Sequence, residues 1–572
     1  MSEESSSTFT DTNDNIVSDR VEVVQKKRLQ AIGFIFILVF AVVVGRLTYI
    51  QVIQGDDYAK KAVQQRMVSI PVDINRGAIY DRNMIPFTDR EIKKTVIVYP
   101  AYIQNKQASI ETISKACGIP EATVASRING SSDTVEFISQ YMDNEYLRLI
   151  ESSRLKGVIA VEKELRYSPS GIAKHAIGYI SKTDKKGQMG IEKSMNSFLS
   201  GSASDSIIAV VDSSKNIIPG LGFRKVEVNK DGLNYSVKLT LDYHIQKIVE
   251  DVMKKNNVSG SVVVMDVSNG DIVGMASMPD FDQDNLDKYL NSSGNELINK
   301  SVWEFDFGSI FKTVVAAAAF ENKIITPDFK TRCTGSIKSG NTTIKCSTYS
   351  THKDRELDVK SGFALSCNTE FVTIGTKVGA EKILDMAKRF GFGQKQCPFL
   401  PEEKAGYIPT PQEDGIGNIS IGQGKIQVTP LQVTSMMATI ADDGIRHAPN
   451  LVDSLLDSNG IVVKKLDRSK PEVIVSPSTC AILKDMLLEV TRTGTAKQAN
   501  MDEYGGCSGK TSTAETGINS GEVTHGWFAG FFPSNAPQYA MTVFVYNGQS
   551  GGKAAAPIFK EIAVRMLEEV KK

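Results

Sequence analysis

The sequence predicts an α+β protein that is tied to a membrane by a single helix near its N-terminus. Three observations lead to this fold class. One uniformly apolar run occupies residues 31–53, alternating segments typical of strands lie at both ends of residues 236–572, and helix-forming segments lie between them. Strands far apart in the sequence, with helices between them, predict an antiparallel-type sheet flanked by helices.

The apolar run is long enough to cross a bilayer. As a helix, residues 31–53 would span roughly 34 Å, against a hydrocarbon core of roughly 30 Å. Arg46, near the far end, can extend its side chain to the interface. Lys26, Lys27 and Arg28 precede the run and predict a cytoplasmic N-terminus, with the bulk of the chain outside the cytoplasm. A signal peptide would need a small-x-small cleavage site, which is absent after the run, and a buried core helix is rarely so uniformly apolar.

Composition and length set further limits. The 572 residues include 66 basic and 66 acidic ones, so no nucleic acid is expected as a partner. A hydrophobic fraction of 41% allows a large core, and the length allows several domains. The predicted parts are a disordered cytoplasmic tail (1–28), a transmembrane anchor (29–53), an elongated pedestal or interaction module (54–235) and a large C-terminal domain (236–572), which is called the catalytic domain below because the motifs described next lie in it.

Strand and turn signals are clearest in the catalytic domain. The expected strands are Tyr235–Leu241, then Ser261–Asp266 with Asp271–Ala276, and finally Trp527–Pro533 with Tyr539–Tyr546. Asn269-Gly270 marks the second and third of these strands as a β-hairpin. An amphipathic helix is expected at Ala555–Val570.

A serine and a lysine one helical turn apart form the first candidate site. Gly308-Ser309-Ile310-Phe311-Lys312 precedes the strong helix former TVVAAAAF. Residues at i and i+3 share a helix face, and a helix N-terminus favours developing negative charge. A buried lysine amine with a lowered pKa can take the serine proton. Alone, the pair is a weak signal that occurs by chance in many proteins, and a capping serine with a solvated lysine is the more common explanation.

Two later motifs change that interpretation. Ser366-Cys367-Asn368 follows Ser309 by 57 residues, and Lys510-Thr511-Ser512-Thr513 lies further on, before a predicted strand. The order Ser-x-x-Lys, Ser-x-Asn, Lys-Thr-small is the signature of penicillin-recognising serine enzymes. Helix-cap residues at 366 and 368 and a solvated lysine at 510 explain each motif singly, but not the three in this order.

The chain resembles the class B penicillin-binding proteins, which are monofunctional peptidoglycan D,D-transpeptidases, and within them the Firmicutes members. The resemblance covers nearly all of the chain after the tail. Its further segments are Arg76–Asn83, Arg166-Tyr167 with Pro169, Gly190-Ile191-Glu192, Leu239–Asp242 with Gln246, Gly422-Gln423-Gly424, Thr429–Gln432 and Trp527–Gly530. No glycosyltransferase segment lies between the anchor and residue 236, which disfavours the bifunctional class A form.

The resemblance implies an acyl-enzyme mechanism without a required cofactor. Ser309 would attack the penultimate D-Ala carbonyl of a stem peptide with Lys312 as base, Ser366 would relay a proton, and Asn368 would hold the substrate amide. The implied catalytic residues are Ser309, Lys312, Ser366, Asn368 and Lys510, and the implied substrate-binding residues are Thr511, Ser512 and Thr513. The backbone N–H groups of Ser309 and Thr513 would form the oxyanion hole, and an amine from a neighbouring strand would take the acyl group.

The resemblance also implies location and partners. A single-pass cell-membrane protein is expected, with its catalytic domain outside the cytoplasm. Expected partners are peptidoglycan stem peptides, β-lactams, a membrane glycosyltransferase and proteins of the division or elongation machinery. Two other functions remain open: a non-catalytic penicillin-binding sensor or scaffold of the wall machinery, although such sensors usually carry several spans, and a β-lactamase, although these are commonly single domains.

The sequence departs from the family pattern in two places. Ser512 stands where Gly is usual, and Asp306-Phe307 stand where Glu-Pro is common. By the period of two, Ser512 shares a strand face with Lys510. We therefore expect its side chain to lean toward the cleft and narrow it, which would alter β-lactam acylation while activity survives. The sequence offers no physical account of Phe307.

Four residues also suggest a metal site. Among seven cysteines, Cys333, Cys346 and Cys367 lie near His352 in the sequence. Thiolates and an imidazole suit a tetrahedral structural Zn²⁺ ion, and some penicillin-binding proteins of anaerobic Firmicutes carry zinc near this motif. Asp354 is a substitute ligand. A Cys333–Cys346 disulfide and free buried thiols are the alternatives.

Overall fold

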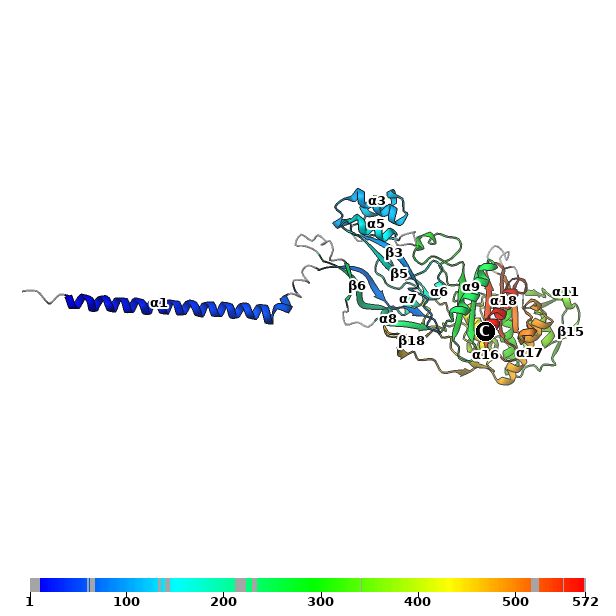
Figure 1. The fold of residues 1–572 in the computed structure, drawn as a ribbon. Coiled ribbons are helices and arrows are strands. Elements are labelled where there is room, and N and C mark those ends of the chain that lie inside the picture. Colours follow the sequence, from blue (N-terminus) through cyan, green and yellow to red (C-terminus); the bar gives the residue numbers. More distant parts are fainter. Residues whose placement is uncertain are drawn as a thin grey trace, which may run out of the picture.

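A computed structural model shows an elongated molecule in which a long N-terminal helix leads to the pedestal and then to the catalytic domain (Figure 1). The α+β class agrees with the prediction. The structure describes residues 11–58, 61, 67–131, 135–138, 145–210, 223–228, 234–340, 342–515, 524–548 and 550–569.

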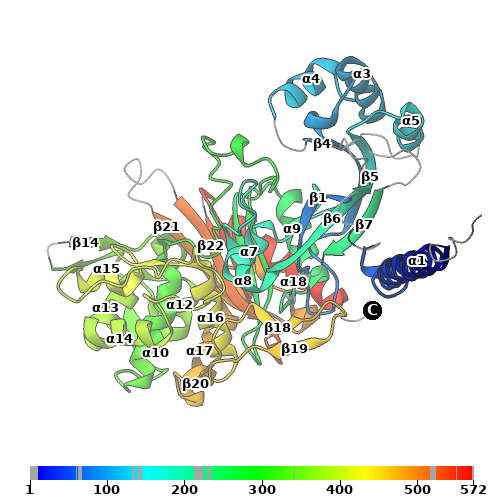
Figure 2. The same ribbon diagram turned by 90° about the vertical axis from the view of Figure 1, so that its left-hand side faces the viewer.

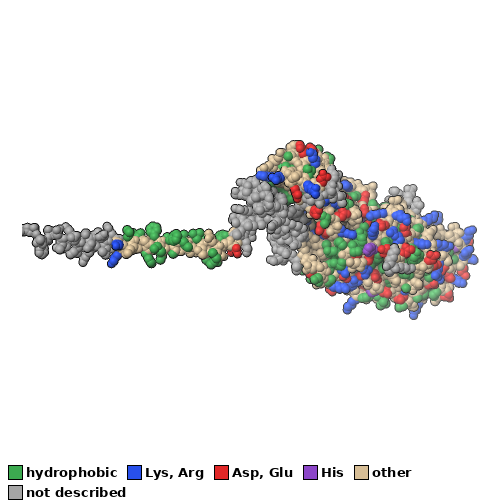
Figure 3. All heavy atoms as spheres, viewed as in Figure 1, with side chains coloured by type: hydrophobic (Ala, Val, Ile, Leu, Met, Phe, Trp, Pro, Cys, Tyr) green, Lys and Arg blue, Asp and Glu red, His purple; other side chains and the backbone are tan. Residues whose placement is uncertain are grey.

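The N-terminal helix α1 (Asp11–Thr48) continues as a π-helical turn through Tyr49–Ile53. Its part Lys26–Ile53 is long and apolar enough to cross a membrane, and it is not buried against the rest of the chain. Figure 3 shows hydrophobic side chains along it. The segment therefore fits a single-pass membrane anchor.

The predicted tail differs from the structure. Residues 1–10 lie outside the described residues, but the chain is helical from Asp11 onward, so residues 11–28 are not the disordered segment that the sequence predicts. Extending an existing helix avoids the cost of nucleating a new one. The apolar anchor helix can therefore propagate into a polar segment that would not form a helix alone.

Two three-stranded antiparallel sheets build the pedestal. The first has the order β1-β6-β7, with β1 Met67–Arg76, β6 Ser200–Val210 and β7 Phe223–Val228. The second has the order β4-β3-β5, with β3 Glu91–Val98, β4 Val135–Ile138 and β5 Val158–Leu165. It is covered by α3 Lys106–Cys117, α4 Glu121–Asn129 and α5 Glu145–Ser153. These elements share a small core that is separate from that of the catalytic domain.

One buried carboxylate gathers three segments of the pedestal. Glu192, in the short helix α7 (Gly190–Ser194), is completely buried. It accepts from Arg76 Nε at 2.5 Å and from the Tyr167 hydroxyl at 2.9 Å, and Arg166 Nη2 lies 2.8 Å away. A buried charge is stable only with such partners. Three of the segments that resemble the family, Arg76–Asn83, Arg166–Pro169 and Gly190–Glu192, thus meet at Glu192.

The catalytic domain is built on a five-stranded antiparallel sheet with the order β10-β9-β23-β22-β21, of which Figure 2 labels β21 and β22. Its strands are β9 Gly260–Asp266, β10 Ile272–Met278, β21 Ser508–Glu515, β22 Thr524–Phe532 and β23 Tyr539–Val545. The predicted hairpin is β9–β10, and the predicted C-terminal strand pair is β22–β23. The expected closing helix is α18 (Ala556–Glu569).

Helices cover both faces of this sheet. Phe528 packs edge-to-face against Phe559 of α18, with ring centroids 4.7 Å apart. Thr542, next to the β23 partner of Phe528, instead accepts a hydrogen bond from Thr434 of α16 (Pro430–Ala441) at 2.8 Å. Because successive strand residues point to opposite faces, α18 and α16 lie on opposite sides. The other described α-helices of the catalytic domain are α9 Tyr243–Lys255, α10 Lys312–Glu321, α11 Tyr349–His352, α12 Val359–Ala364, α13 Asn368–Val378, α14 Ala380–Arg389, α15 Ile416–Ile421 and α17 Pro477–Arg492.

The predicted strand at 235–241 joins a different sheet. It forms β8 (Ser236–Leu239) in a four-stranded sheet of order β19-β18-β8-β2. Its partners are β2 Ile79–Tyr80, β18 Val452–Leu456 and β19 Val462–Lys465. Since β2 comes from the pedestal and runs parallel to β8, backbone hydrogen bonds join the pedestal to the catalytic domain.

Candidate active site

The proposed nucleophile lies in a tight turn ahead of a buried helix. Ser309 is part of the 3-10 turn η4 (Gly308–Phe311), and Lys312 begins α10. In a 3-10 turn, side chains at i and i+3 eclipse one another. Lys312 Nζ lies 3.2 Å from Ser309 Oγ. The structure therefore brings together the pair that the spacing predicts, on a 3-10 turn rather than on a regular α-helix.

Lys312 is surrounded by hydrogen-bond acceptors and excluded from solvent. Its ammonium donates to Asn368 Oδ1 at 2.7 Å, to Ser366 O at 2.9 Å and to Ser366 Oγ at 3.2 Å. Burial lowers the pKa of Lys312 to about 8. A share of the amine is therefore neutral near neutral pH, as a general base requires.

The second motif lies between α12 and α13. Ser366 has φ +57°, which is rare for a residue other than glycine and is typical of functional sites. Its hydroxyl is shared by two amines, Lys312 Nζ at 3.2 Å and Lys510 Nζ at 3.1 Å. Asn368 Nδ2 donates to the Lys345 carbonyl at 2.9 Å, which fixes the orientation of its amide. Neither Ser366 nor Asn368 acts here as a side-chain helix cap.

Lys510, in the edge strand β21, reaches the same site from the sheet. Its side chain is completely buried, so it is not the solvated lysine of the alternative interpretation. Burial first, and then the nearby charge of Lys312, hold the pKa of Lys510 well below its ordinary value. Three motifs that are far apart in the sequence thus converge on the hydroxyl of Ser366.

The other β21 residues divide between the two strand faces. Ser512 is 1% exposed and donates to the Phe307 carbonyl at 2.8 Å. The prediction that it leans into the cleft is wrong, because the face it shares with Lys510 packs against the turn that carries Ser309. On the other face, Thr511 Oγ1 lies 2.6 Å from Thr495 Oγ1, and Thr513 is exposed.

This arrangement has the parts of an acyl-transfer site. Ser309, Asn368 and Thr513 are the members with accessible surface, whereas Lys312 and Lys510 are buried. A ligand can therefore touch a nucleophile, an amide and a hydroxyl. The two lysines behind them supply a base and positive charge. The predicted substrate-binding residues Thr511 and Ser512 are both buried and would act through their backbone.

Sequence reasoning missed a buried acid next to this site. Glu370, in α13, is 1% exposed, and neither of its carboxylate oxygens has a hydrogen-bond partner among the described residues. Burial raises its pKa well above the ordinary value, which favours the protonated form. It packs on Gly362, where a Cβ would overlap its Oε2. The available signal was an acidic residue two positions after Asn368, directly before the apolar Phe371 and Val372 of α13.

The four predicted metal ligands do meet in space. The ligand atoms of Cys333, Cys346, His352 and Cys367 all lie within 4.8 Å of one another, and all four residues are buried. Cys346 Sγ is 3.8 Å from both Cys367 Sγ and His352 Nε2. All seven cysteines are free thiols in the described chain, which contradicts a Cys333–Cys346 disulfide. Asp354 lies outside the cluster and accepts from Tyr349.

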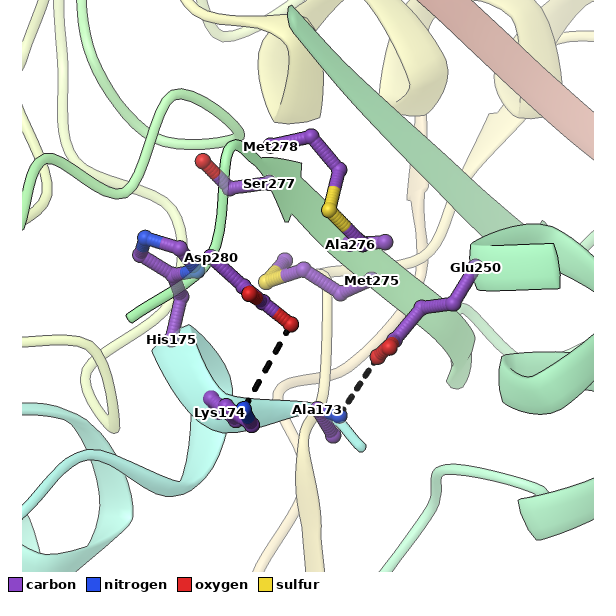
Figure 4. Close-up of a pocket in the computed structure, with 9 residues that line it drawn as sticks. All are labelled: Ala173, Lys174, His175, Glu250, Met275, Ala276, Ser277, Met278 and Asp280. Atoms are coloured by element: carbon purple, nitrogen blue, oxygen red, sulfur yellow. Dashed lines mark hydrogen bonds and ion pairs between the residues drawn. The ribbon is translucent and has the colours of Figure 1, made fainter. Parts of the chain in front are cut away.

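A small pocket lies elsewhere, at the junction of the pedestal and the catalytic domain (Figure 4). Lys174 forms an ion pair with Asp280 at 3.5 Å, and the Ala173 N–H donates to Glu250 at 2.6 Å. Burial lowers the pKa of the nearby His175 to about 4, so this imidazole is neutral. The charged groups satisfy one another and join the two parts of the chain.

The sequence matches the penicillin binding protein transpeptidase domain over residues 260–563, more than half of the chain. This chain belongs to the penicillin-binding protein transpeptidase family. A second match, to the penicillin-binding protein dimerisation domain, covers residues 71–231 and coincides with most of the pedestal. The resemblance to class B penicillin-binding proteins is thereby confirmed, and the chain is a serine-type transpeptidase.

Relatives of this penicillin-binding protein match it over most of their length. Stage V sporulation protein D of Bacillus subtilis is 28% identical over 96% of this chain and 86% of its own. The peptidoglycan D,D-transpeptidase MrdA of Acinetobacter baumannii is 24% identical over 94% and 88%. Penicillin binding protein 3 of Mycobacterium tuberculosis, solved with aztreonam, has a TM-score of 0.63 and 22% identity over 88% of this chain and 97% of its own. That likeness supports the fold.

Proposed function

We propose that this penicillin-binding protein is a peptidoglycan D,D-transpeptidase that cross-links stem peptides through an acyl-enzyme on Ser309. The observation that carries the proposal is the buried amine of Lys312, 3.2 Å from Ser309 Oγ and with its pKa lowered to about 8. A nucleophile beside an amine of that pKa can be deprotonated without a separate cofactor.

Each proton has a route in this geometry. Neutral Lys312 takes the proton of Ser309 as Oγ attacks the penultimate D-Ala carbonyl, and the oxyanion is held by the N–H groups of Ser309 and Thr513. The C–N bond then breaks, and the leaving D-Ala amine takes a proton from Ser366, which is reprotonated from Lys312. In the second half, the amine of a neighbouring stem peptide attacks the ester, and its proton returns along the same route while Ser309 is restored.

Substrate recognition follows from charge and exposure. Lys510, when protonated, places positive charge behind the end of the cleft where the terminal carboxylate of the peptide would bind, with the Thr513 hydroxyl and the β21 backbone beside it. A β-lactam would enter in the same way. Ser309 would open its four-membered amide, and the leaving nitrogen would stay attached to the acyl group, which blocks attack by the acceptor amine.

We infer the membrane topology and the partners of the chain from its anchor and its family. Lys26, Lys27 and Arg28 before the anchor support a cytoplasmic N-terminus and a catalytic domain outside the cytoplasm, where peptidoglycan lies. We propose domain boundaries near residues 53 and 235, where the helical anchor ends and β8 begins, whereas residue 28 lies within α1. A membrane glycosyltransferase and division or elongation proteins are the partners that the likeness to class B penicillin-binding proteins implies.

Labelling with a fluorescent penicillin tests the proposal. The wild-type chain in detergent micelles should bind one label per chain and keep it for hours, and Ser309→Ala should bind none. Cross-linked stem-peptide dimers should form when lipid-linked precursor and a glycosyltransferase are supplied, as seen by mass spectrometry. Absence of label on the wild type would indicate a scaffold, and rapid release of the label would indicate a β-lactamase.

We also propose a structural zinc ion at Cys333, Cys346, His352 and Cys367. At Zn–S distances of about 2.3 Å, tetrahedral geometry places two sulfur atoms about 3.8 Å apart, and Cys346 and Cys367 have this separation. The ion would brace the wall that carries Asn368, without a part in the chemistry. Elemental analysis of purified protein should find about one equivalent of zinc, and less than one-tenth would rule the site out.

A further inference from the structure

The turn that carries Ser309 is tethered on two sides. On one side, the Gly308 N–H donates to the Gly422 carbonyl at 2.8 Å. On the other side, the hydroxyl of Ser512 donates to the Phe307 carbonyl at 2.8 Å. The second tether crosses from the sheet to the nucleophile turn, and it exists only because residue 512 has a side chain.

We propose that Ser512 is a positioning residue that sets the spacing of the oxyanion hole; this rests on the proposed transpeptidase function. The two N–H donors, at Ser309 and Thr513, belong to different elements, the turn η4 and the strand β21. Ser512 directly precedes Thr513, and Phe307 lies two residues before Ser309. The Ser512–Phe307 hydrogen bond therefore links the two elements that carry the donors. An oxyanion site depends on donors held a fixed distance apart before the reaction begins. This bond fixes that distance.

The two departures from the family pattern, Phe307 in place of proline and Ser512 in place of glycine, account for one another. A proline at position 307 would lock φ near −65° and stiffen the turn from within. Phe307 has φ −91° and no such lock. Its ring packs at 6.2 Å from Trp527, which is the cross-strand partner of Ser512. The side chain and the carbonyl of Phe307 are thus both held by the β21–β22 pair, and an external restraint replaces the internal one.

The site also shows why the tether is specific. Gly308 has φ +68°, and a Cβ built there would lie 2.4 Å from Ser512 Oγ. The hydroxyl therefore fills the space left by a glycine in the nucleophile turn. A glycine at 512 would leave this buried space empty and the Phe307 carbonyl without its donor, whereas a larger residue would press on the turn.

Acylation kinetics separate positioning from simple packing. The full chain in detergent is mixed with a fluorescent penicillin by stopped flow, and the acylation rate constant is measured apart from the dissociation constant of the prior non-covalent complex. Ser512→Ala and Ser512→Gly remove the hydroxyl. Ser508→Ala is the matched control, because Ser508 is equally buried in the same strand and bonds Ser534 at 3.0 Å, away from the site.

The expected result is an acylation rate constant lower by about threefold to tenfold in both Ser512 variants, with the dissociation constant within twofold of wild type. Ser508→Ala should lower the melting temperature but acylate at the wild-type rate. Wild-type rates in the Ser512 variants, a change confined to the dissociation constant, or an equal loss in Ser508→Ala would each overturn the proposal. A wild-type chain that is never acylated would instead refute the proposed function.

Discussion

Lys312 and Lys510 donate to the same hydroxyl group, Oγ of Ser366, at 3.2 and 3.1 Å. Both amines are buried, and the pKa of each is lowered, in both cases chiefly by burial. Two buried cations this close disfavour each other's charge. A proton taken up by Lys312 can therefore pass on through the Ser366 hydroxyl. Lys510 holds that hydroxyl in place, and in its protonated form it attracts a carboxylate.

The pH dependence of acylation follows from the pKa of Lys312. Its folded-state value of about 8 lies below the ordinary 10.5, so the neutral amine accumulates as pH rises through 8. Only that form accepts the Ser309 proton. The acylation rate constant should therefore rise about tenfold for each pH unit below 8 and level off above it. Stopped-flow measurements from pH 6 to 9.5 check this, with the melting temperature followed as a control. A flat profile would contradict it.

Local sequence patterns predict much of this site. The spacing of Ser309 and Lys312 is a short-range relationship, so the sequence predicts their contact correctly whether the turn is 3-10 or α. The β9–β10 hairpin is equally local, because Asn269-Gly270 specifies its turn. The convergence of the three motifs is not local. It became predictable only through their order and spacing in a known family.

The side-chain directions were harder to predict, for a physical reason. The period of two places Lys510 and Ser512 on one face of β21, but it does not say what covers that face. The covering segment is the Phe307–Ser309 turn, about 200 residues earlier in the sequence. Likewise, alternation identified β8 as a strand, whereas its pairing with β2 of the pedestal depends on tertiary structure.

Gly308→Ala tests the space in front of Ser512. A left-handed φ of +68° costs a non-glycine residue about 1–2 kcal/mol, and the added Cβ would displace the Ser512 hydroxyl. The acylation rate constant should fall by about tenfold or more. Gly340→Ala is the matched control, since Gly340 has φ +59° and open space around it. It should lose similar stability and keep its acylation rate. Equal acylation losses in the two variants would count against the steric argument.

Glu370→Gln should stabilise the protein increasingly as pH rises. The pKa of Glu370 is raised in the folded state above its ordinary 4.5, so above that pH folding must take up a proton. Stability is thereby lost with rising pH, by at most about 1.4 kcal/mol per unit. Glutamine does not titrate, so the variant does not lose stability in this way as the pH rises. Denaturant unfolding at pH 5, 6.5 and 8 should show a growing advantage for the variant. Glu381→Gln, at an exposed position, should show a constant difference, and a constant difference for Glu370→Gln would refute the argument.

Metal removal should loosen the wall around Asn368. A zinc chelator that strips the proposed site leaves up to three thiols and an imidazole buried without a common partner. The melting temperature should fall by several degrees, since structural zinc contributes folding free energy directly. Re-addition of zinc should restore it, and magnesium should not. A Cys333→Ser variant should already melt lower and respond less to the chelator. An unchanged melting curve in both cases would exclude a structural ion.

Glu192→Ala should weaken the pedestal without disabling the nucleophile. The substitution leaves Arg76 and Arg166 buried without their shared carboxylate, and breaking a buried ion pair costs about 3–5 kcal/mol. Because a multidomain chain does not unfold in one step, hydrogen exchange of the β1 and β5 peptides is the suitable measurement, and both should exchange faster. Glu164→Ala, at an exposed position on β5, is the control. Fluorescent penicillin should still label Ser309 in the variant. Protection equal to wild type would show that the network does not hold the pedestal together.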